Sequence, residues 1–193
     1  MSCQPTNSAA VRLAAAHDDY VREVSETYDE VLVEVSGRIE ATTSIGKADI
    51  GALLFWKRLR ADTKWVRELM LLPDAHVRSV TQAAVASVRD PALATPAAAS
   101  AGRSALSPLP GFVVGDALAS ALLVAAAPAR MAVYDRRAHV GLGRLGMTLS
   151  SSPGRYGRYM TLVEQLRVKV QNVCGRQLSA RDVDLALYWL GGR

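Results

Sequence analysis

The chain has 193 residues, which is enough for one domain with a hydrophobic core or for two small lobes. Half of the residues are hydrophobic and 21% are charged, which is typical of a globular protein and not of a disordered one. The two cysteines, Cys3 and Cys174, exclude a disulfide framework and a four-thiolate metal site. The three histidines lie far apart and lack the spacing of metal ligands, so we expect no metal and no cofactor; they are His17, His76 and His139.

The formal net charge of +5 is unevenly distributed along the chain. Residues 1–50 hold four basic and nine acidic residues, whereas the remainder holds 19 basic and nine acidic residues. A basic body of this kind suits a polyanionic partner such as nucleic acid, although charge alone does not identify one.

The sequence shows no signal peptide and no membrane anchor. The N-terminus lacks a charged start followed by an apolar block. The most apolar run, Ala117 to Ala129, has 13 residues, whereas a membrane span needs about 20. We therefore expect a cytoplasmic protein without a membrane partner, in which this run forms a buried core helix.

The N-terminal half is expected to be helical. Apolar residues recur near a 3.6-residue period over residues 8–40, with acidic residues between them, which predicts one long helix. Asp49 is placed to cap a second helix that begins at Ile50, and a short third helix is expected to end at Leu72. Asp74 is placed to cap a helix over residues 75–88.

The C-terminal half adds further helices, separated by residues that break or cap them. Helices are expected over residues 97–106, 116–127, 135–145, 156–173 and 180–190, with a loop over 146–155. Ser179 is placed to cap the last helix. Because no stretch alternates as a strand does, the predicted fold class is all-α.

The stretch that carries chemical information joins a tight turn to an acidic residue one helix later. Leu109-Pro110-Gly111-Phe112 and Gly115 precede the apolar helix, and Asp135 follows it after a loop that contains Pro128. A turn of this kind places backbone N–H groups at the start of a helix, where they bind a phosphate without side chains. Glycine suits the turn because the phosphate must approach the backbone closely.

In this order and spacing, the Leu-Pro-Gly turn, the Ala-rich helix and Val-Tyr-Asp resemble the helix-hairpin-helix/Gly-Pro-Asp superfamily of DNA glycosylases. That superfamily includes endonuclease III and the 8-oxoguanine glycosylases, and the match covers residues 106–145. The resemblance implies a two-lobed helical fold in one compact domain over residues 1–193. Its expected parts are an acidic N-terminal helix (1–45), a helical lobe (46–108), the helix-hairpin-helix with the catalytic Asp (109–145) and C-terminal helices (146–193).

The chain also departs from the pattern of that superfamily. Its hairpin is two residues longer, and it lacks the four-cysteine cluster motif. Bifunctional members carry a lysine near the start of the second hairpin helix, where this chain has Asp116 or Ala117, and no lysine lies between Lys64 and Lys169. A Schiff-base mechanism needs an amine nucleophile, so we expect a monofunctional glycosylase without lysine-dependent strand cleavage.

By the resemblance, the catalytic residue is Asp135. Its carboxylate would stabilise the positive charge that develops on the deoxyribose and orient or deprotonate the attacking water. Asp116 is a second catalytic candidate, although a helix N-cap explains it more simply.

A glycosylase must draw the target base out of the duplex, which requires an apolar or aromatic pocket. The candidates for this pocket are Phe55, Trp56, Tyr134, Tyr188 and Trp189. Aromatic residues at helical spacing fit a hydrophobic core equally well. The expected contacts to the DNA backbone are Gly111, Gly115, Arg136, Arg137, Arg144, Arg155 and Arg158.

The expected partner is double-stranded DNA that contains a modified base, and no obligatory protein partner is inferred. The excised base stays open between an oxidised or alkylated base in repair and a hypermodified phage base, such as a glucosylated hydroxymethylcytosine, in antiviral defence. A non-catalytic helix-hairpin-helix DNA-binding protein, in which Asp135 only caps a helix, is the first alternative. A scaffold that binds another protein through its acidic N-terminal helix is the second.

Overall fold

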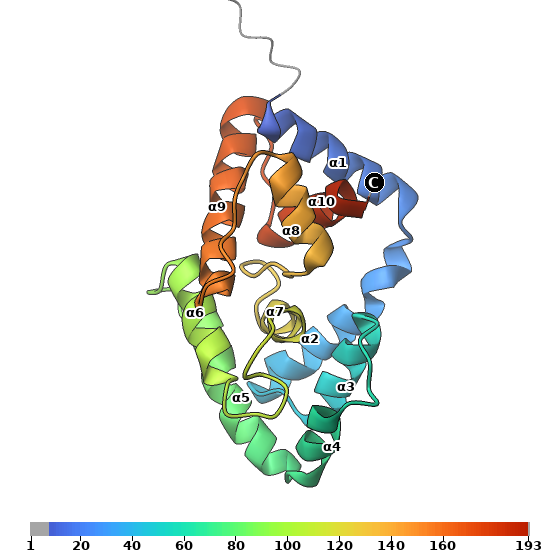
Figure 1. The fold of residues 1–193 in the computed structure, drawn as a ribbon, viewed down its shortest axis with the longest axis vertical. Coiled ribbons are helices and arrows are strands. Elements are labelled where there is room, and N and C mark those ends of the chain that lie inside the picture. The colour runs from blue at the N-terminus through green and yellow to red at the C-terminus, as the bar shows by residue number, and fades with distance from the viewer. Residues whose placement is uncertain (1–7, 193) are drawn as a thin grey trace, which may run out of the picture.

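The computed structural model describes residues 8–192, which form helices joined by turns and loops (Figure 1). These residues hold ten α-helices, one 3₁₀-helix and no strand, so the prediction of an all-α fold is confirmed. The elements are α1 (Ala9–Glu23), η2 (Glu26–Asp29), α2 (Glu30–Thr42), α3 (Lys47–Trp56), α4 (Lys64–Leu71), α5 (Asp74–Arg89), α6 (Thr95–Ala105), α7 (Ala117–Ala126), α8 (Arg136–Arg144), α9 (Arg155–Cys174) and α10 (Ala180–Gly192).

The helices form two lobes, one above the other in Figure 1. In the upper lobe, α10 packs against α8, α1 and α9. In the lower lobe, α5 packs against α6, while α2 packs against α3 and α7. A contact between α6 and α9 joins the two lobes.

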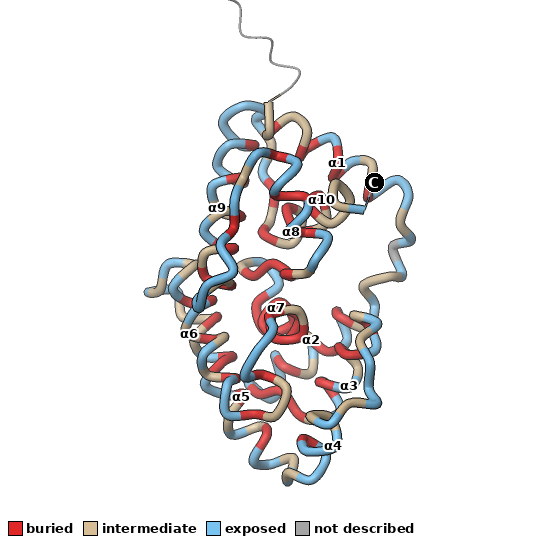
Figure 2. Tube along the Cα trace, viewed as in Figure 1, coloured by how far each residue is buried: buried red, intermediate tan, exposed pale blue. Residues whose placement is uncertain are grey.

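Helix α7 lies at the centre of the molecule, where Figure 2 shows it as a helix of buried residues. Every residue from Leu118 to Ala126 is buried, so the apolar run is a core helix, as its length predicted. No helix within residues 8–192 is both long enough and apolar enough to cross a membrane.

The prediction of one long helix over residues 8–40 is wrong, because the chain breaks between α1 and α2. Val24 takes an extended conformation (φ −103°, ψ 134°). Ser25 then caps η2 through its side chain, which accepts the N–H of Thr27. A serine hydroxyl can compete for backbone N–H groups in this way, and the apolar period that continues past the break hides it in the sequence.

The other expected helices are present, with small differences at their ends. Helix α3 begins three residues before the expected Ile50, so Asp49 lies in its first turn and accepts the N–H of Gly46 at 2.9 Å. Ser179 caps α10 as predicted, since its hydroxyl accepts the N–H of Asp182 at 3.1 Å.

The apolar face of the acidic helix α1 packs against other helices of the protein. Leu13 and Ala16 are buried, and the helix packs against α9 and α10. Arg176, just after α9, donates hydrogen bonds to His17 and Asp18 of α1, which ties α1 to the end of α9.

Candidate functional site

Asp135 lies where a buried, extended segment enters α8. Two buried side chains fix that segment: Asp184 accepts the N–H of Val133 at 2.7 Å, and the Ser120 hydroxyl accepts the N–H of Tyr134 at 2.9 Å. Oδ1 of Asp135 accepts the backbone N–H three residues further on at 2.9 Å, so its carboxylate caps α8. The backbone is therefore fixed on both sides of the expected catalytic residue.

Lys57 provides the second partner of this carboxylate. It follows the last residue of α3, in the lower lobe, and its Nζ donates to Oδ2 of Asp135 at 2.9 Å. The two side chains are 13% and 19% exposed. Spacing along the chain did not reveal this lysine, because 78 residues separate it from Asp135. A Schiff base needs an amine nucleophile, and Lys57 places one beside Asp135, so the expectation that no lysine lies near the expected catalytic residue holds along the chain but not in space.

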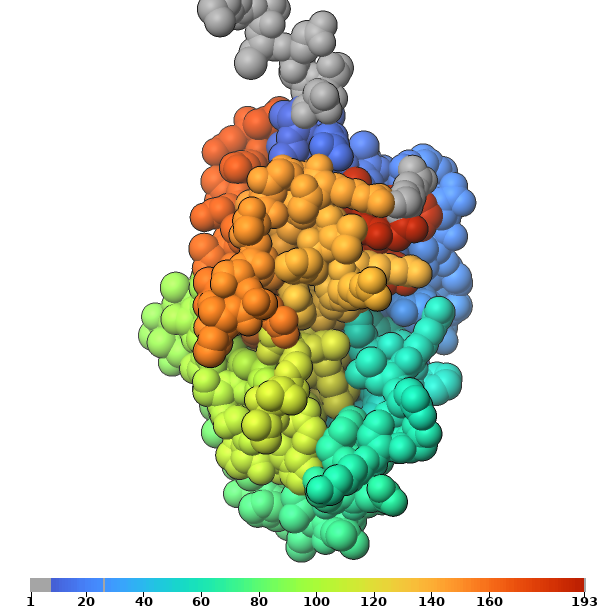
Figure 3. Space-filling model, viewed as in Figure 1, coloured from blue at the N-terminus to red at the C-terminus, as the bar shows by residue number. Residues whose placement is uncertain are grey.

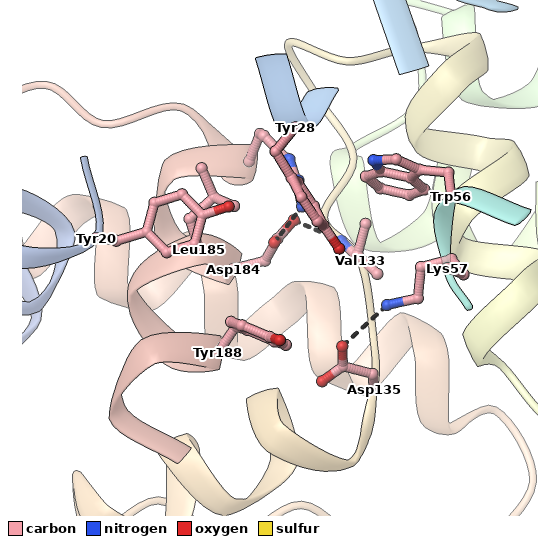
Figure 4. A pocket seen from close by; sticks show the side chains of 10 residues that line it. Tyr20, Tyr28, Trp56, Lys57, Val133, Asp135, Asp184, Leu185 and Tyr188 are labelled. Atoms are coloured by element: carbon pink, nitrogen blue, oxygen red, sulfur yellow. Dashed lines mark hydrogen bonds and ion pairs between the residues drawn. The ribbon is translucent and has the colours of Figure 1, made fainter. Parts of the chain in front are cut away.

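A small cavity, which we call the inner chamber, lies beside this ion pair (Figure 4). Its volume of about 30 Å³ is room for water but not for a base. It lies at the junction of the two lobes, since its walls come from both. The lining residues are Tyr20, Tyr28, Trp56, Lys57, Val133, Asp135, Arg181, Asp184, Leu185 and Tyr188.

A network of buried charges supports the inner chamber. Arg181 donates to both carboxylate oxygens of Asp29, at 3.1 and 3.0 Å, and to Asp184 at 2.6 Å. Burial raises the pKa of Asp184 to about 7, although Arg181 opposes the shift. Burial lowers the pKa of Arg181, but Asp184 and Asp29 more than offset this and hold it above its usual range. The network thus fixes α10 against the segment that leads to Asp135.

A wider cavity, the outer chamber, shares Tyr20, Tyr28 and Tyr188 with the inner chamber. Its volume is about 350 Å³, which is within the range of cavities that hold small ligands. Arg58 lies 5.6 Å from the ring centroid of Tyr28, and Arg137 lies 4.8 Å from that of Tyr188. Flat aromatic walls of this kind suit the stacking of a planar ring. The other lining residues are Val24, Trp189 and Gly192.

Asp116, the second catalytic candidate, lies at the hairpin and lines neither chamber. Arg103 Nε donates to one carboxylate oxygen at 2.9 Å, and Arg155 Nε donates to the other at 2.8 Å. Arg103 also donates to the carbonyl oxygens of Phe112 and Gly115, at 2.7 and 3.0 Å. Asp116 is 8% exposed, and its carboxylate joins α6, the hairpin and α9. This geometry is that of a structural ion-pair cluster.

The two additional residues of the hairpin form its exposed tip. Val113 and Val114 are 73% and 81% exposed, and they lie between two glycines with left-handed backbone. Gly111 has φ 87° and Gly115 has φ 85°, which glycine adopts without strain. A Cβ atom at Gly111 would lie 2.3 Å from the Trp65 ring, so only glycine fits there.

The structure brings three of the five predicted pocket aromatics to the chambers. Trp56 lines the inner chamber, Trp189 lines the outer one, and Tyr188 lines both. Phe55 is instead 75% exposed, and Tyr134 is buried beside the chambers without lining either.

Sequence reasoning missed the residues that reach the chambers from distant segments. Two tracts in the sequence pointed to this region: Phe55-Trp56-Lys57-Arg58, with its mixture of aromatic and basic residues, and Tyr188-Trp189. The lining residues without any such signal include Tyr20, Tyr28, Arg181 and Asp184.

The five arginines predicted to contact DNA fall into two groups. One lies exposed in the first turn of α8, beside the expected catalytic residue: Arg136. Four donate hydrogen bonds to other groups of the protein itself: Arg137, Arg144, Arg155 and Arg158.

The part of the chain that the structure describes contains no group of three or more His, Cys, Asp and Glu side chains that could hold a metal ion. Cys174 is exposed, whereas Cys3 lies outside the described residues. Comparisons of the chain with protein-family models, with curated proteins and with solved structures find no match. Its function is therefore inferred from the geometry of the two chambers and the hairpin.

Proposed function

We propose that this protein is a monofunctional DNA glycosylase, which hydrolyses the bond between a flipped, modified base and its deoxyribose and leaves an abasic site. One observation carries the proposal: the oriented carboxylate of Asp135 borders a water-sized chamber, and an aromatic chamber adjoins it. Hydrolysis of an N-glycosidic bond uses this combination of a carboxylate, a water molecule and a place for the extruded base.

In the proposed reaction, the carboxylate of Asp135 has two roles. As the bond between C1′ and the base nitrogen breaks, positive charge develops on the sugar, and the Asp135 carboxylate stabilises it. The same carboxylate accepts a proton from the water whose oxygen bonds to C1′. Oxygens that already accept one hydrogen bond keep a second lone pair for these contacts, and the two existing bonds hold the carboxylate in one orientation.

Duplex DNA would contact the face that carries both the hairpin and α8. Figure 3 shows the hairpin segment and the amber α8 segment on this same face. Backbone N–H groups around Gly111 and Gly115 would bind a phosphate, and Arg136 would bind another. The predominance of basic residues after residue 50 supports this binding mode.

The identity of the base is the open part of the proposal. An oxidised or alkylated base would place the protein in housekeeping repair. A hypermodified phage base, such as a glucosylated hydroxymethylcytosine, would place it in antiviral defence. Base release from a panel of DNAs separates these roles, with abasic sites scored by alkali cleavage. The panel holds oligonucleotides with uracil, 8-oxoguanine and alkyladenine, and genomic DNA from phages with ordinary and glucosylated cytosine.

The decisive variant is Asp135→Asn. Asparagine still caps α8, so the fold and the DNA affinity are expected to persist while base release falls by about 100-fold or more. Asp62→Asn, which removes a carboxylate that is 69% exposed, is the matched control and should keep full release. Equal turnover by Asp135→Asn and the unaltered protein would overturn the mechanism.

One observation favours a second candidate, a non-catalytic DNA-binding protein. Oδ1 of Asp135 caps α8, and this role needs no chemistry. Such a protein would bind DNA with a strong salt dependence and would release no base from any member of the panel.

A further inference from the structure

The outer chamber differs from the inner chamber in its charge. In the inner chamber two carboxylates, Asp135 and Asp184, are balanced by Lys57 and Arg181, whereas the residues that line the outer chamber include two arginines and no carboxylate. These guanidinium groups lie over the rings of Tyr28 and Tyr188. Arg137 also donates to the Tyr188 hydroxyl at 2.6 Å. Positive charge therefore lies against the aromatic walls of the chamber that a base would enter.

Arg58 holds a backbone conformation that is unusual for an arginine. Its φ is 54°, at the turn that ends α3. There the N–H of Arg58 bonds the carbonyl of Phe55 at 2.9 Å, and the N–H of Leu59 bonds the carbonyl of Leu54 at 3.0 Å. Glycine is the usual residue in left-handed backbone at a helix C-terminus. An arginine in this position is a local strain of the kind that is found at functional sites.

We propose that the outer chamber holds the departing base, and that Arg58 and Arg137 restrict the substrate to neutral bases that leave as anions. This inference rests on the proposed glycosylase function and names its substrate class. The two guanidinium groups would donate hydrogen bonds to the carbonyl oxygens of the base, where the negative charge collects.

The charge balance of the reaction explains the selection. When a neutral base leaves, the electron pair of the C1′–N bond stays on the base. The base is then an anion until it takes the proton that the attacking water gives up, and nearby guanidinium groups stabilise it. An alkylated base such as 7-methylguanine carries a positive charge beforehand and leaves as a neutral molecule. It gains nothing from the arginines in the transition state, and they repel it when it binds.

The first measurement compares two sets of duplex oligonucleotides. One set carries neutral bases with carbonyl oxygens (uracil, 8-oxoguanine and 5-hydroxymethyluracil), and glucosylated phage DNA is added to it. The other set carries the cationic bases 7-methylguanine and 3-methyladenine. We expect the unaltered protein to release a base only from the neutral set.

The second measurement uses Arg58→Gly, which keeps the left-handed backbone and removes only the side chain. We expect it to lower release of the neutral base by about tenfold to a hundredfold, as loss of one donor to a developing anion does. Arg60→Gln is the matched control, because Arg60 is 81% exposed, pairs with Asp62 and lies outside the chamber. Arg137→Gln tests the second arginine in the same way, on a different element.

Each outcome separates this inference from the function on which it rests. Release of a cationic base in preference to neutral ones would overturn the inference and leave the glycosylase function intact. Equal rates of base release by Arg58→Gly and Arg60→Gln would also overturn the inference. So would an Arg58→Gly variant whose release rate falls by the same factor for neutral and cationic bases, because a simple contact to a phosphate predicts that result. No release from any DNA would overturn the glycosylase function, and the inference with it.

Discussion

Asp116 and Asp135 each lie at the start of a helix, yet their surroundings differ. Each oxygen of Asp116 meets an arginine, and one of these arginines also holds two hairpin carbonyls. Asp135 meets a backbone N–H and one lysine, and it borders a chamber that has room for water. Asp116 also borders a cavity, of about 520 Å³ beside the hairpin, so open space alone does not distinguish the two carboxylates. Only Asp135 lines the inner chamber, which adjoins the aromatic chamber proposed for the base, and the rule we draw is that a carboxylate outside the two chambers has a structural role.

The largest expected effect on stability comes from Asp116→Asn. Loss of this buried carboxylate leaves Arg103 and Arg155 without their shared partner, which should lower the free energy of unfolding by about 3 kcal/mol. Asp135→Asn should cost less, about 2 kcal/mol, because asparagine still caps the helix but leaves one lysine, Lys57, without its anionic partner. Urea denaturation of both variants checks this order. A larger loss for Asp135→Asn would contradict the division of roles.

A smaller effect is expected from Gly141→Ala, a substitution on α8, the helix that Asp135 caps. A Cβ atom at Gly141 would lie 2.2 Å from the carbonyl oxygen of Leu187, so α8 would have to move away from α10. We expect a loss of about 2 kcal/mol in the free energy of unfolding, together with reduced base release, because Asp135 shifts relative to Tyr188.

Gly143→Ala is the matched control for Gly141→Ala, since it lies on the same helix with no neighbouring atom within 4 Å of the new Cβ. It should stabilise the protein by up to about 1 kcal/mol, because alanine favours a helix over glycine. If the two variants have the same stability in urea denaturation, then close packing of α8 on α10 does not position the site.

The sequence predicted most of the helices, and it singled out Asp135 as a candidate, because both inferences depend on local order. Apolar periods, capping residues and the spacing from the Leu-Pro-Gly turn to Asp135 are visible within short segments. The chambers depend instead on contacts between lobes, such as the one that brings Lys57 to Asp135, and no local pattern encodes them. The sequence did not reveal the break after α1, because the apolar period continues through it. For the same reason it did not reveal that Tyr28, which follows the break, lines the chambers.

The smallest expected effect concerns Asp182, a third carboxylate in the first turn of a helix, on which the same rule can be tested. Asp182 accepts the N–H of Ser179 at 2.8 Å and lies 3.3 Å from Nε2 of His17, and, like Asp116, it lines neither chamber. Burial acts to raise its pKa, but the hydrogen bonds from His17 and Ser179 more than offset this and lower it to about 2. The rule therefore assigns Asp182 a structural role with a defined pH dependence.

Because the pKa of Asp182 is lower in the folded protein than in the unfolded chain, its stabilisation is present above pH 4 and is lost as the pH falls toward 2. The side chain is 34% exposed, so after allowance for solvent screening we expect about 1 kcal/mol at pH 6. Urea denaturation should show Asp182→Asn less stable than the unaltered protein at pH 6, with the gap closing by pH 2.5. A gap that is constant over this range would mean that Asp182 acts through its shape and not its charge, and the rule drawn from Asp116 would then not extend to α10.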